Sequence, residues 1–201
     1  MACWPASGGE ARRHAGTAHI DVDGLTRTQG DEIAGRLAAR GIEISGLGYF
    51  PNPLHADAGH RAEVIGHLRK VIAAAGAIRV KVVNTFLGGD RTLPLDDNWR
   101  RAQEIFAPIV RDAADSGVTL CFENCPMIFS RDEWPGGHNI AYSPKIRRRI
   151  FGEWGDAVGM NFDPSHLVWQ MIDQGRFIRE LEHVAQNRFP LLRGVLYTRT
   201  G

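Results

Sequence analysis

Two short segments of the chain each end an apolar run with one carboxylate. FENCP at residues 122–126 places Glu123 there, and NFDPSH at residues 161–166 places Asp163. A buried strand has little use for a charge at its tip, because removing a carboxylate from water costs free energy. Two such groups close together would repel each other, and a divalent cation between them resolves the repulsion.

His166 follows Asp163 by three residues, so a strand-to-helix turn would place an imidazole beside that carboxylate. Carboxylate and imidazole ligands suit Mn²⁺, Co²⁺, Fe²⁺, Mg²⁺ or Zn²⁺. Purely structural interpretations stay open for each residue. Asp163 before Pro164 is typical of a helix N-cap and first turn. Glu123 would equally suit pairing with a loop arginine, and a single histidine is often structural.

The elements that carry these residues alternate between two hydrophobic periods. The runs with strand character are residues 42–49, 79–86, 118–124 and 157–163. The segments with helical period are residues 64–75, 99–113, 143–154 and, more weakly, 173–182. Strict alternation of strands and helices indicates parallel βα units. Successive strand centres lie 37 to 40 residues apart. No Gly-x-Gly-x-x-Gly turn follows any strand, so the pattern favours a (β/α)₈ TIM barrel over a doubly wound sheet.

The length of the chain conflicts with a complete barrel. A barrel typically needs ~250 residues, and this chain has 201. The sequence therefore predicts one partial TIM-barrel domain over residues 1–201, in which about strands 2–5 are clear and the last strands are missing. In such barrels the active site is built from the carboxyl ends of the strands. Asn84, Glu123 and Asp163 all fall at those ends.

Composition excludes several classes of protein. The formal net charge is +1, so no strong field would attract nucleic acid or a membrane surface. No apolar stretch approaches the ~20 residues of a membrane span, and the N-terminus lacks the apolar core of a signal peptide. Three cysteines are an odd number without framework spacing, which fits free thiols in the cytoplasm. Residues 147–149, three consecutive arginines, are interpreted as the solvated face of a helix.

Five motifs resemble the sugar phosphate isomerase/epimerase family, with its xylose-isomerase-like barrel. They occur in the family's order, and the resemblance covers about residues 1–180. In chain order the motifs are GYFPNPL, VVNTF, ENCPM, DEWPGGHNIAYSP and NFDPSHLVWQMID. The tail from residue 183 to residue 201 does not resemble the family.

The resemblance implies a role for individual residues. Glu123 matches the family's metal-binding glutamate, which is also half of its acid/base pair, and Asp163 matches the metal-binding aspartate. His166 matches a histidine that contacts substrate near the metal. Asn84 and Trp134 are further substrate-binding candidates; Trp134 lies in a polar, glycine-rich loop suited to a lid.

The family's chemistry is a proton transfer on a sugar or sugar phosphate. By resemblance, a divalent metal binds the carbonyl and hydroxyl oxygens and stabilises the enediolate that forms when a proton leaves the neighbouring carbon. One glutamate removes the proton and a second returns it. This sequence offers Glu123 for one role and no residue for the other. A further metal-binding histidine is missing too, so the chain is expected to be a poor catalyst and to derive from a truncated or frame-shifted reading.

Two alternatives to an isomerase remain open at this stage. Metal-dependent endonucleases that cut DNA at abasic sites share the barrel and the Asp-x-x-His turn, but they need histidines on earlier strands. Here those strands end in GYFPN and VVNTF, and the near-neutral charge disfavours a DNA partner. The other alternative is a non-catalytic fragment that covers its open strand edges by association into a homo-oligomer.

Overall fold

The core of the molecule is a four-stranded parallel sheet. The computed structural model describes residues 20–128, 130–133, 137–175 and 178–179. The strands are β1 Leu47–Tyr49, β2 Val82–Thr85, β3 Thr119–Glu123 and β4 Val158–Asn161. Each strand pairs in parallel with the next one along the chain, in the order β1-β2-β3-β4. The prediction that consecutive strands lie side by side and parallel is thereby confirmed.

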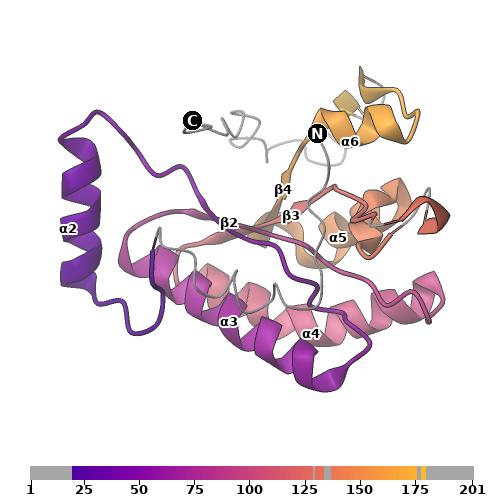
Figure 1. Ribbon diagram of the computed structural model, residues 1–201, viewed down its shortest axis with the longest axis horizontal. Coiled ribbons are helices and arrows are strands. Elements are labelled where there is room, and N and C mark those ends of the chain that lie inside the picture. The colour runs from indigo at the N-terminus through magenta and orange to yellow at the C-terminus, as the bar shows by residue number, and fades with distance from the viewer. Residues whose placement is uncertain (1–19, 129, 134–136, 176–177, 180–201) are drawn as a thin grey trace.

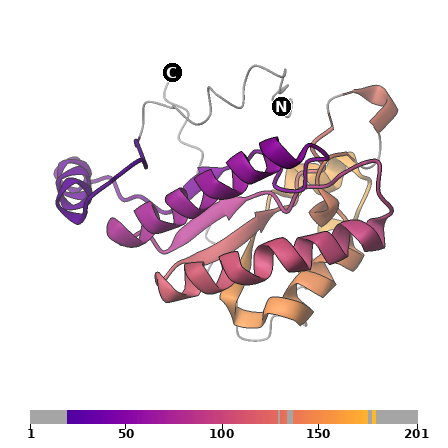
Figure 2. The same cartoon turned by 90° about the horizontal axis from the view of Figure 1, so that it is seen from below.

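Helices connect the strands and cover one face of the sheet. The α-helices are α2 Arg27–Ala38, α3 Ala58–Ala77, α4 Leu95–Asp115, α5 Pro144–Trp154 and α6 Pro164–Trp169. Short 3₁₀ turns are η1 Arg131–Glu133, η2 Ile140–Tyr142 and η3 Gly155–Ala157. α3 packs on β1 and β2, α4 on β3, and α5 on β4. Two perpendicular views show α3 and α4 side by side on the same side of the sheet (Figures 1 and 2).

Alternate residues of each strand point to opposite faces of the sheet, which separates packing from chemistry. On β3, Leu120 and Phe122 belong to the hydrophobic core beneath the helices. Phe122 meets Phe106 of α4 edge to face, with ring centroids 5.1 Å apart. Cys121 and Glu123 therefore lie on the opposite face, away from that helix layer. The α/β class and the partial barrel predicted from the sequence are confirmed.

The observed strands are shorter than the predicted ones, most clearly at β1. The prediction began that strand at residue 42, whereas pairing starts at Leu47. β1 lies at an edge of the described sheet and has a hydrogen-bonded neighbour on one side only, so fewer of its residues are held extended. The weak helix predicted over residues 173–182 falls partly, and the tail 183–201 wholly, outside the described residues.

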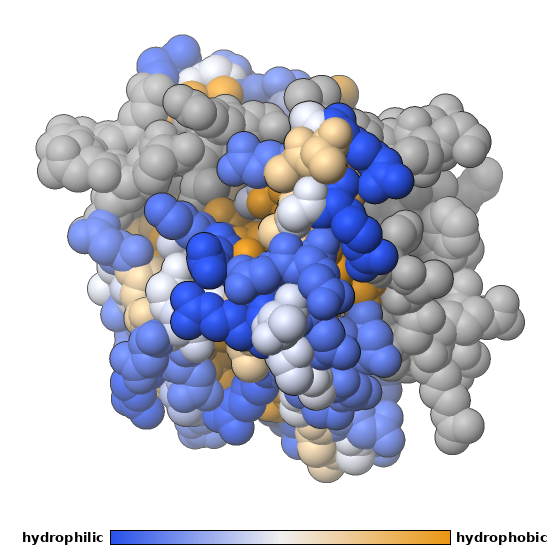
Figure 3. Space-filling model, turned by 90° about the vertical axis from the view of Figure 1, so that its left-hand side faces the viewer, coloured by the Kyte–Doolittle hydropathy of each residue, from blue (hydrophilic) through white to orange (hydrophobic). Residues whose placement is uncertain are grey.

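Helix α2 stands away from the sheet, beyond the β1 edge (Figure 1). A capping box between Thr26 and Gln29 starts it. Gly30 is its one buried residue, and a Cβ there would lie 2.4 Å from a methyl carbon of Ile78. The surface seen from the α2 side is mostly hydrophilic, and hydrophobic side chains show in the recesses (Figure 3). No helix in the described part of the chain has the length and apolar character to cross a membrane.

We expect Phe106→Ala to lower the free energy of unfolding by about 3–5 kcal/mol, because Phe106 is fully buried between α4 and the sheet. Glu104→Ala, at an exposed position on the same helix, is the matched control and should change it by about 0.5 kcal/mol or less. Urea denaturation followed by circular dichroism measures both. Similar losses in the two variants would contradict the assigned core.

Candidate active site

Glu123 ends β3 as a buried residue, 4% exposed, and three hydrogen-bond donors hold its carboxylate. Its Oε1 accepts from the backbone N–H of Asn124 at 2.8 Å and of Cys125 at 3.2 Å. Its Oε2 accepts from Nδ2 of Asn161. Asn161 ends β4 and pairs with Glu123 in the strand register. The carboxylate is therefore fixed in orientation by its own turn and by the neighbouring strand.

Asp163 lies just beyond β4 and serves two purposes with its two oxygens. Oδ1 accepts from the N–H of Ser165 at 2.8 Å and caps α6. Oδ2 lies 3.5 Å from Nε2 of His166. The same Nε2 lies 3.9 Å from Oε1 of Glu123. The N-cap interpretation is thus correct, and it does not exclude the functional one.

The three side chains predicted to act together, Glu123, Asp163 and His166, do meet; we call them the acid–imidazole cluster. Asn124 links the two strand ends that carry it. Its Nδ2 donates to the carbonyl of Asp163 at 2.8 Å, and its Oδ1 accepts from the N–H of Asp163 at 2.7 Å. Because both polar atoms of this fully buried amide are used, the distance between the ends of β3 and β4 is fixed.

Burial sets the protonation behaviour of the cluster. It raises the pKa of Glu123 to about 7, since removal from water penalises the carboxylate. The hydrogen bond from the Asn124 backbone opposes that rise, while the charge of Asp163 adds to it. Burial lowers the pKa of His166, and the Asp163 carboxylate acts in the opposite direction. Glu123 can therefore gain or lose a proton near neutral pH.

Arg147 corrects an expectation from the sequence. Residues 147–149 were expected on a solvated helix face, but Arg147 is fully buried. Its Nε donates to the carbonyl of Ala141 at 2.7 Å, and one terminal nitrogen donates to that of Tyr142 at 2.7 Å. Burial lowers the pKa of its guanidinium to about 9, and Glu123 works against that lowering. Along α5 the first arginine of the run falls on the buried side, between Ile146 and Ile150.

The two remaining predicted site residues differ in what the structure says of them. Asn84 of β2 is buried and pairs in register with Cys121. It therefore lies on the face of the sheet that carries Glu123, two residues deeper along the strands. Trp134 lies outside the described residues. Sequence reasoning missed Asn124 and Asn161, whose partners lie 39 and 38 residues away.

The donor atoms of the acid–imidazole cluster suit a divalent cation in chemistry but not in number. Two carboxylates and one imidazole are hard or borderline ligands of the appropriate kind. Within the described ranges, however, no group of three or more His, Cys, Asp or Glu side chains is arranged to hold a metal ion. The described residues therefore supply at most two carboxylates and one imidazole at this position, fewer donors than a divalent cation needs.

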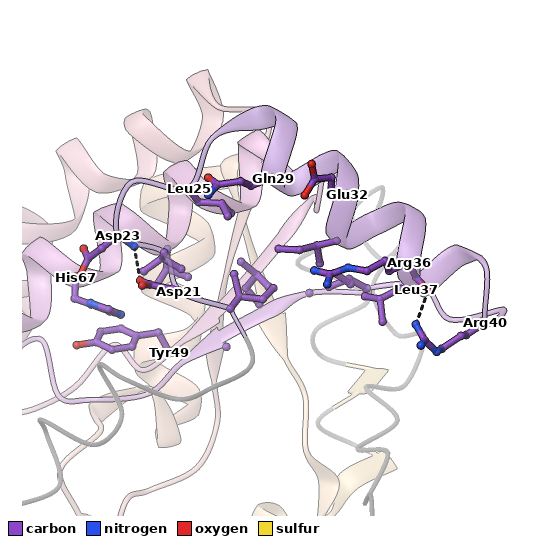
Figure 4. A pocket seen from close by; sticks show the side chains of 18 residues that line it. Asp21, Asp23, Leu25, Gln29, Glu32, Arg36, Leu37, Arg40, Tyr49 and His67 are labelled. Atoms are coloured by element: carbon purple, nitrogen blue, oxygen red, sulfur yellow. Dashed lines mark hydrogen bonds between the residues drawn. The ribbon is translucent and has the colours of Figure 1, made fainter.

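A cavity of about 990 Å³ lies elsewhere, between α2, residues 20–25 and β1. At one end Asp21 and Asp23 lie near Tyr49 and His67, whereas Arg40 lies at the other (Figure 4). The Tyr49 and His67 rings are in contact, with centroids 4.6 Å apart. Burial raises the pKa of Tyr49 to about 12, so its hydroxyl stays protonated at neutral pH. No residue of the acid–imidazole cluster lines this cavity, so it is separate from the cluster.

The sequence matches one protein family over most of its length. The family described as xylose isomerase-like TIM barrel matches residues 10–191. The chain belongs to this family. The match covers most of the chain and includes every strand of the sheet and the whole acid–imidazole cluster.

Solved structures show the same xylose isomerase-like fold at low sequence identity. A putative xylose isomerase from Rhodospirillum rubrum is 12% identical with a TM-score of 0.62, over 85% of this chain and 60% of that one. An L-ribulose 3-epimerase is 22% identical with a TM-score of 0.62, over 82% and 53%. A D-psicose 3-epimerase from Clostridium cellulolyticum is 18% identical with a TM-score of 0.59, over 80% and 56%.

This xylose isomerase-like chain spans little more than half the length of those structures. Among curated proteins, no match to the chain was found. At these identities the structural neighbours establish the fold, and the chemistry must be argued from the residues of the chain itself.

The raised pKa of Glu123 predicts a pH-dependent stability difference between the wild type and Glu123→Gln. The folded state binds the Glu123 proton more tightly than the unfolded state, whose pKa is near the ordinary 4.5. Ionisation therefore costs stability: the cost is absent below pH 4.5, grows up to about pH 7 and is complete above it. The free energy of unfolding of Glu123→Gln minus that of the wild type should rise across this window.

Denaturation at a series of pH values, with a chelator present to exclude metal effects, measures this difference. Glu104→Gln, which removes one exposed carboxylate from α4, is the matched control. The same pH dependence in both variants would contradict the raised pKa of Glu123.

Proposed function

We propose that this chain carries the glutamate–aspartate part of the active site of a metal-dependent sugar or sugar phosphate isomerase or epimerase. The observation that carries the proposal is the convergence of the Glu123 and Asp163 carboxylates on Nε2 of His166, within 3.9 Å, at neighbouring strand ends. The site lies at the carboxyl ends of parallel strands, where barrels of this kind hold their active sites. Two of the structural neighbours, an L-ribulose 3-epimerase and a D-psicose 3-epimerase, support a ketose as the substrate class.

Glu123 is the acid–base residue of this proposal. A carboxyl group whose pKa is near 7 can both accept and release a proton at neutral pH, which is the condition for efficient general acid–base catalysis. Glu123 would take a proton from the carbon next to the sugar carbonyl and leave an enediolate. Return of a proton to the opposite face of that carbon gives an epimer, and return to the neighbouring carbon gives an isomer.

Asp163 and Glu123 would together hold a divalent cation, with other donors completing the ligand set. Mn²⁺, Co²⁺, Mg²⁺, Fe²⁺ and Zn²⁺ all accept such oxygen ligands. A bound cation would act as a Lewis acid towards the carbonyl oxygen. His166, at the rim of the two carboxylates, would hydrogen-bond a sugar hydroxyl, and Asn84 and Trp134 are proposed as further substrate contacts.

The ends of the first two strands argue against the phosphodiesterase alternative. β1 and β2 end in Tyr49 and Thr85, so neither strand end offers the imidazole that a multi-metal endonuclease site would use. A small-molecule sugar therefore remains the proposed partner. A cytoplasmic location, the lack of a nucleic-acid partner and self-association stay predictions.

We expect the 201-residue chain to bind Mn²⁺ weakly and through its carboxylates. Asp163→Asn should reduce the affinity about tenfold or more, since the loss of even an outer-shell partner costs that much. Asparagine keeps the helix cap, so α6 should remain intact in circular dichroism. Titration followed by electron paramagnetic resonance measures the affinity, with Glu104→Gln as the control for loss of one charge. Unchanged affinity in Asp163→Asn would remove this residue from the ligand set.

The reaction itself is tested by incorporation of solvent deuterium into ketoses in the presence of Mn²⁺. In a complete barrel that contains these residues, Glu123→Gln should reduce the exchange rate by ~10²–10⁴-fold, because it removes the general base and leaves the shape of the side chain. Mass spectrometry of the recovered sugar gives the rate. Full exchange in Glu123→Gln would refute the role of Glu123, and no exchange with any ketose in the wild type would refute the proposed reaction.

A further inference from the structure

Asn139 is a fully buried asparagine whose side chain joins three separate parts of the backbone. Its Nδ2 donates to the carbonyl of Glu123 at 2.9 Å and to that of Cys125 at 2.6 Å. Its Oδ1 accepts from the N–H of Gly88 at 3.1 Å and of Ala141 at 3.3 Å. A carboxamide offers two donor hydrogens and two acceptor lone pairs, so its full capacity is used.

The two carbonyls that Asn139 holds belong to the turn that orients the Glu123 carboxylate. The Glu123 carbonyl and the Asn124 N–H are opposite ends of one peptide group. Asn139 donates to the carbonyl end, while the N–H end donates to Oε1 of Glu123. The second carbonyl is that of Cys125, whose own N–H is the other backbone donor to Oε1. Hydrogen bonds at the two ends of one peptide group polarise each other, so donation by Asn139 to the Glu123 carbonyl strengthens the hydrogen bond from the Asn124 N–H to the carboxylate.

The position of Asn139 is itself fixed from several sides. The N–H of Ile140 donates to the carbonyl of Gly88 at 2.9 Å. Arg147, buried beneath the turn, donates to the carbonyls of Ala141 and Tyr142. On the other side, the segment before Asn139 lies so close to the Glu123 turn that a Cβ at Gly137 would come within 2.3 Å of the carbonyl oxygen of Met127.

We propose that Asn139 is a positioning residue for Glu123: its carboxamide sets the turn at residues 123–125 so that two backbone N–H groups aim at the carboxylate. The consequence for catalysis rests on the proposed function, whereas the effect on the turn does not. The hydrogen bonds of the Asn139 side chain go to backbone groups and not to the carboxylate oxygens, so it acts through the peptide groups.

The decisive variant is Asn139→Asp, which keeps the size of the side chain but replaces the donor with an oxygen. That oxygen would face the carbonyls of Glu123 and Cys125 and repel them, so the turn should open. Asn98→Asp is the matched control. Asn98 is equally buried and holds another loop by donating to the carbonyls of Asp90 and Leu93, and no hydrogen bond of that loop reaches Glu123.

Amide hydrogen exchange of the 201-residue chain, read by nuclear magnetic resonance, tests the proposal without any activity. In Asn139→Asp the N–H groups of Asn124 and Cys125 should exchange about tenfold faster or more, as expected when a hydrogen bond to a charged group is lost. In Asn98→Asp both should keep their wild-type protection after correction for global stability. Unchanged protection in Asn139→Asp, or an equal loss in Asn98→Asp, would overturn the proposal.

If Asn139→Asp does not fold, Asn139→Ser takes its place. A serine hydroxyl can donate to only one of the two carbonyls, so it should weaken protection of Asn124 and Cys125 without introducing a repelled charge. Wild-type protection in a folded Asn139→Ser variant would equally overturn the proposal. If both Asn139 variants fail to fold while Asn98→Asp folds, Asn139 is needed for the fold itself, and the positioning role is overturned.

The catalytic consequence is measured separately, in the deuterium assay on a complete barrel that contains these residues. Asn139→Asp should lower kcat while KM changes little, because the substrate contacts are untouched and only the alignment of the base is lost. Absence of any wild-type exchange would refute the proposed reaction and leave the amide result as the test of positioning. Lost amide protection together with an unchanged kcat would show that the turn at residues 123–125 can open without affecting catalysis.

Discussion

The architecture of this site depends on keeping one carboxylate out of water. An isolated buried carboxylate is costly unless hydrogen bonds compensate it. Glu123 receives two of those bonds from its own turn and one from the next strand. The register between β3 and β4 matters for this reason. A slip of one residue would turn the Asn161 side chain to the helix-covered face and leave the carboxylate without that donor.

Amide side chains do most of the joining at the carboxyl ends of the strands. Asn52 bonds both the N–H and the carbonyl of Gly89, Asn139 joins the ends of β2 and β3, and Asn124 joins the ends of β3 and β4. Gly88 shows how closely these connections pack. Its φ is +85°, and a Cβ there would lie 2.2 Å from Oδ1 of Asn52. The side-chain links between these strand ends are thus made by neutral amides, while the buried charge coupled to Glu123 comes from Arg147 of α5.

The fold and the acid–imidazole cluster could be predicted because both follow from local patterns. Apolar runs ended by Glu123 and Asp163 mark strand ends, and parallel strands bring such ends to one edge. Arg147 could not be placed in this way, because three consecutive arginines do not reveal which one faces the core. The asparagines were missed for a different reason. Asn is common in ordinary turns, and the partners that give Asn124 and Asn161 their roles lie on another strand.

The alternation of side chains along β3 has a consequence for how such a protein can change over time. Leu120 and Phe122 face the helices, while Cys121 and Glu123 face the other side. Mutations at the first set act on the packing beneath the helices, and mutations at the second set act on the buried carboxylate and its neighbours. Natural variation can therefore change the second set while the first continues to specify the fold. The twofold period of a strand is in this sense a source of evolvability.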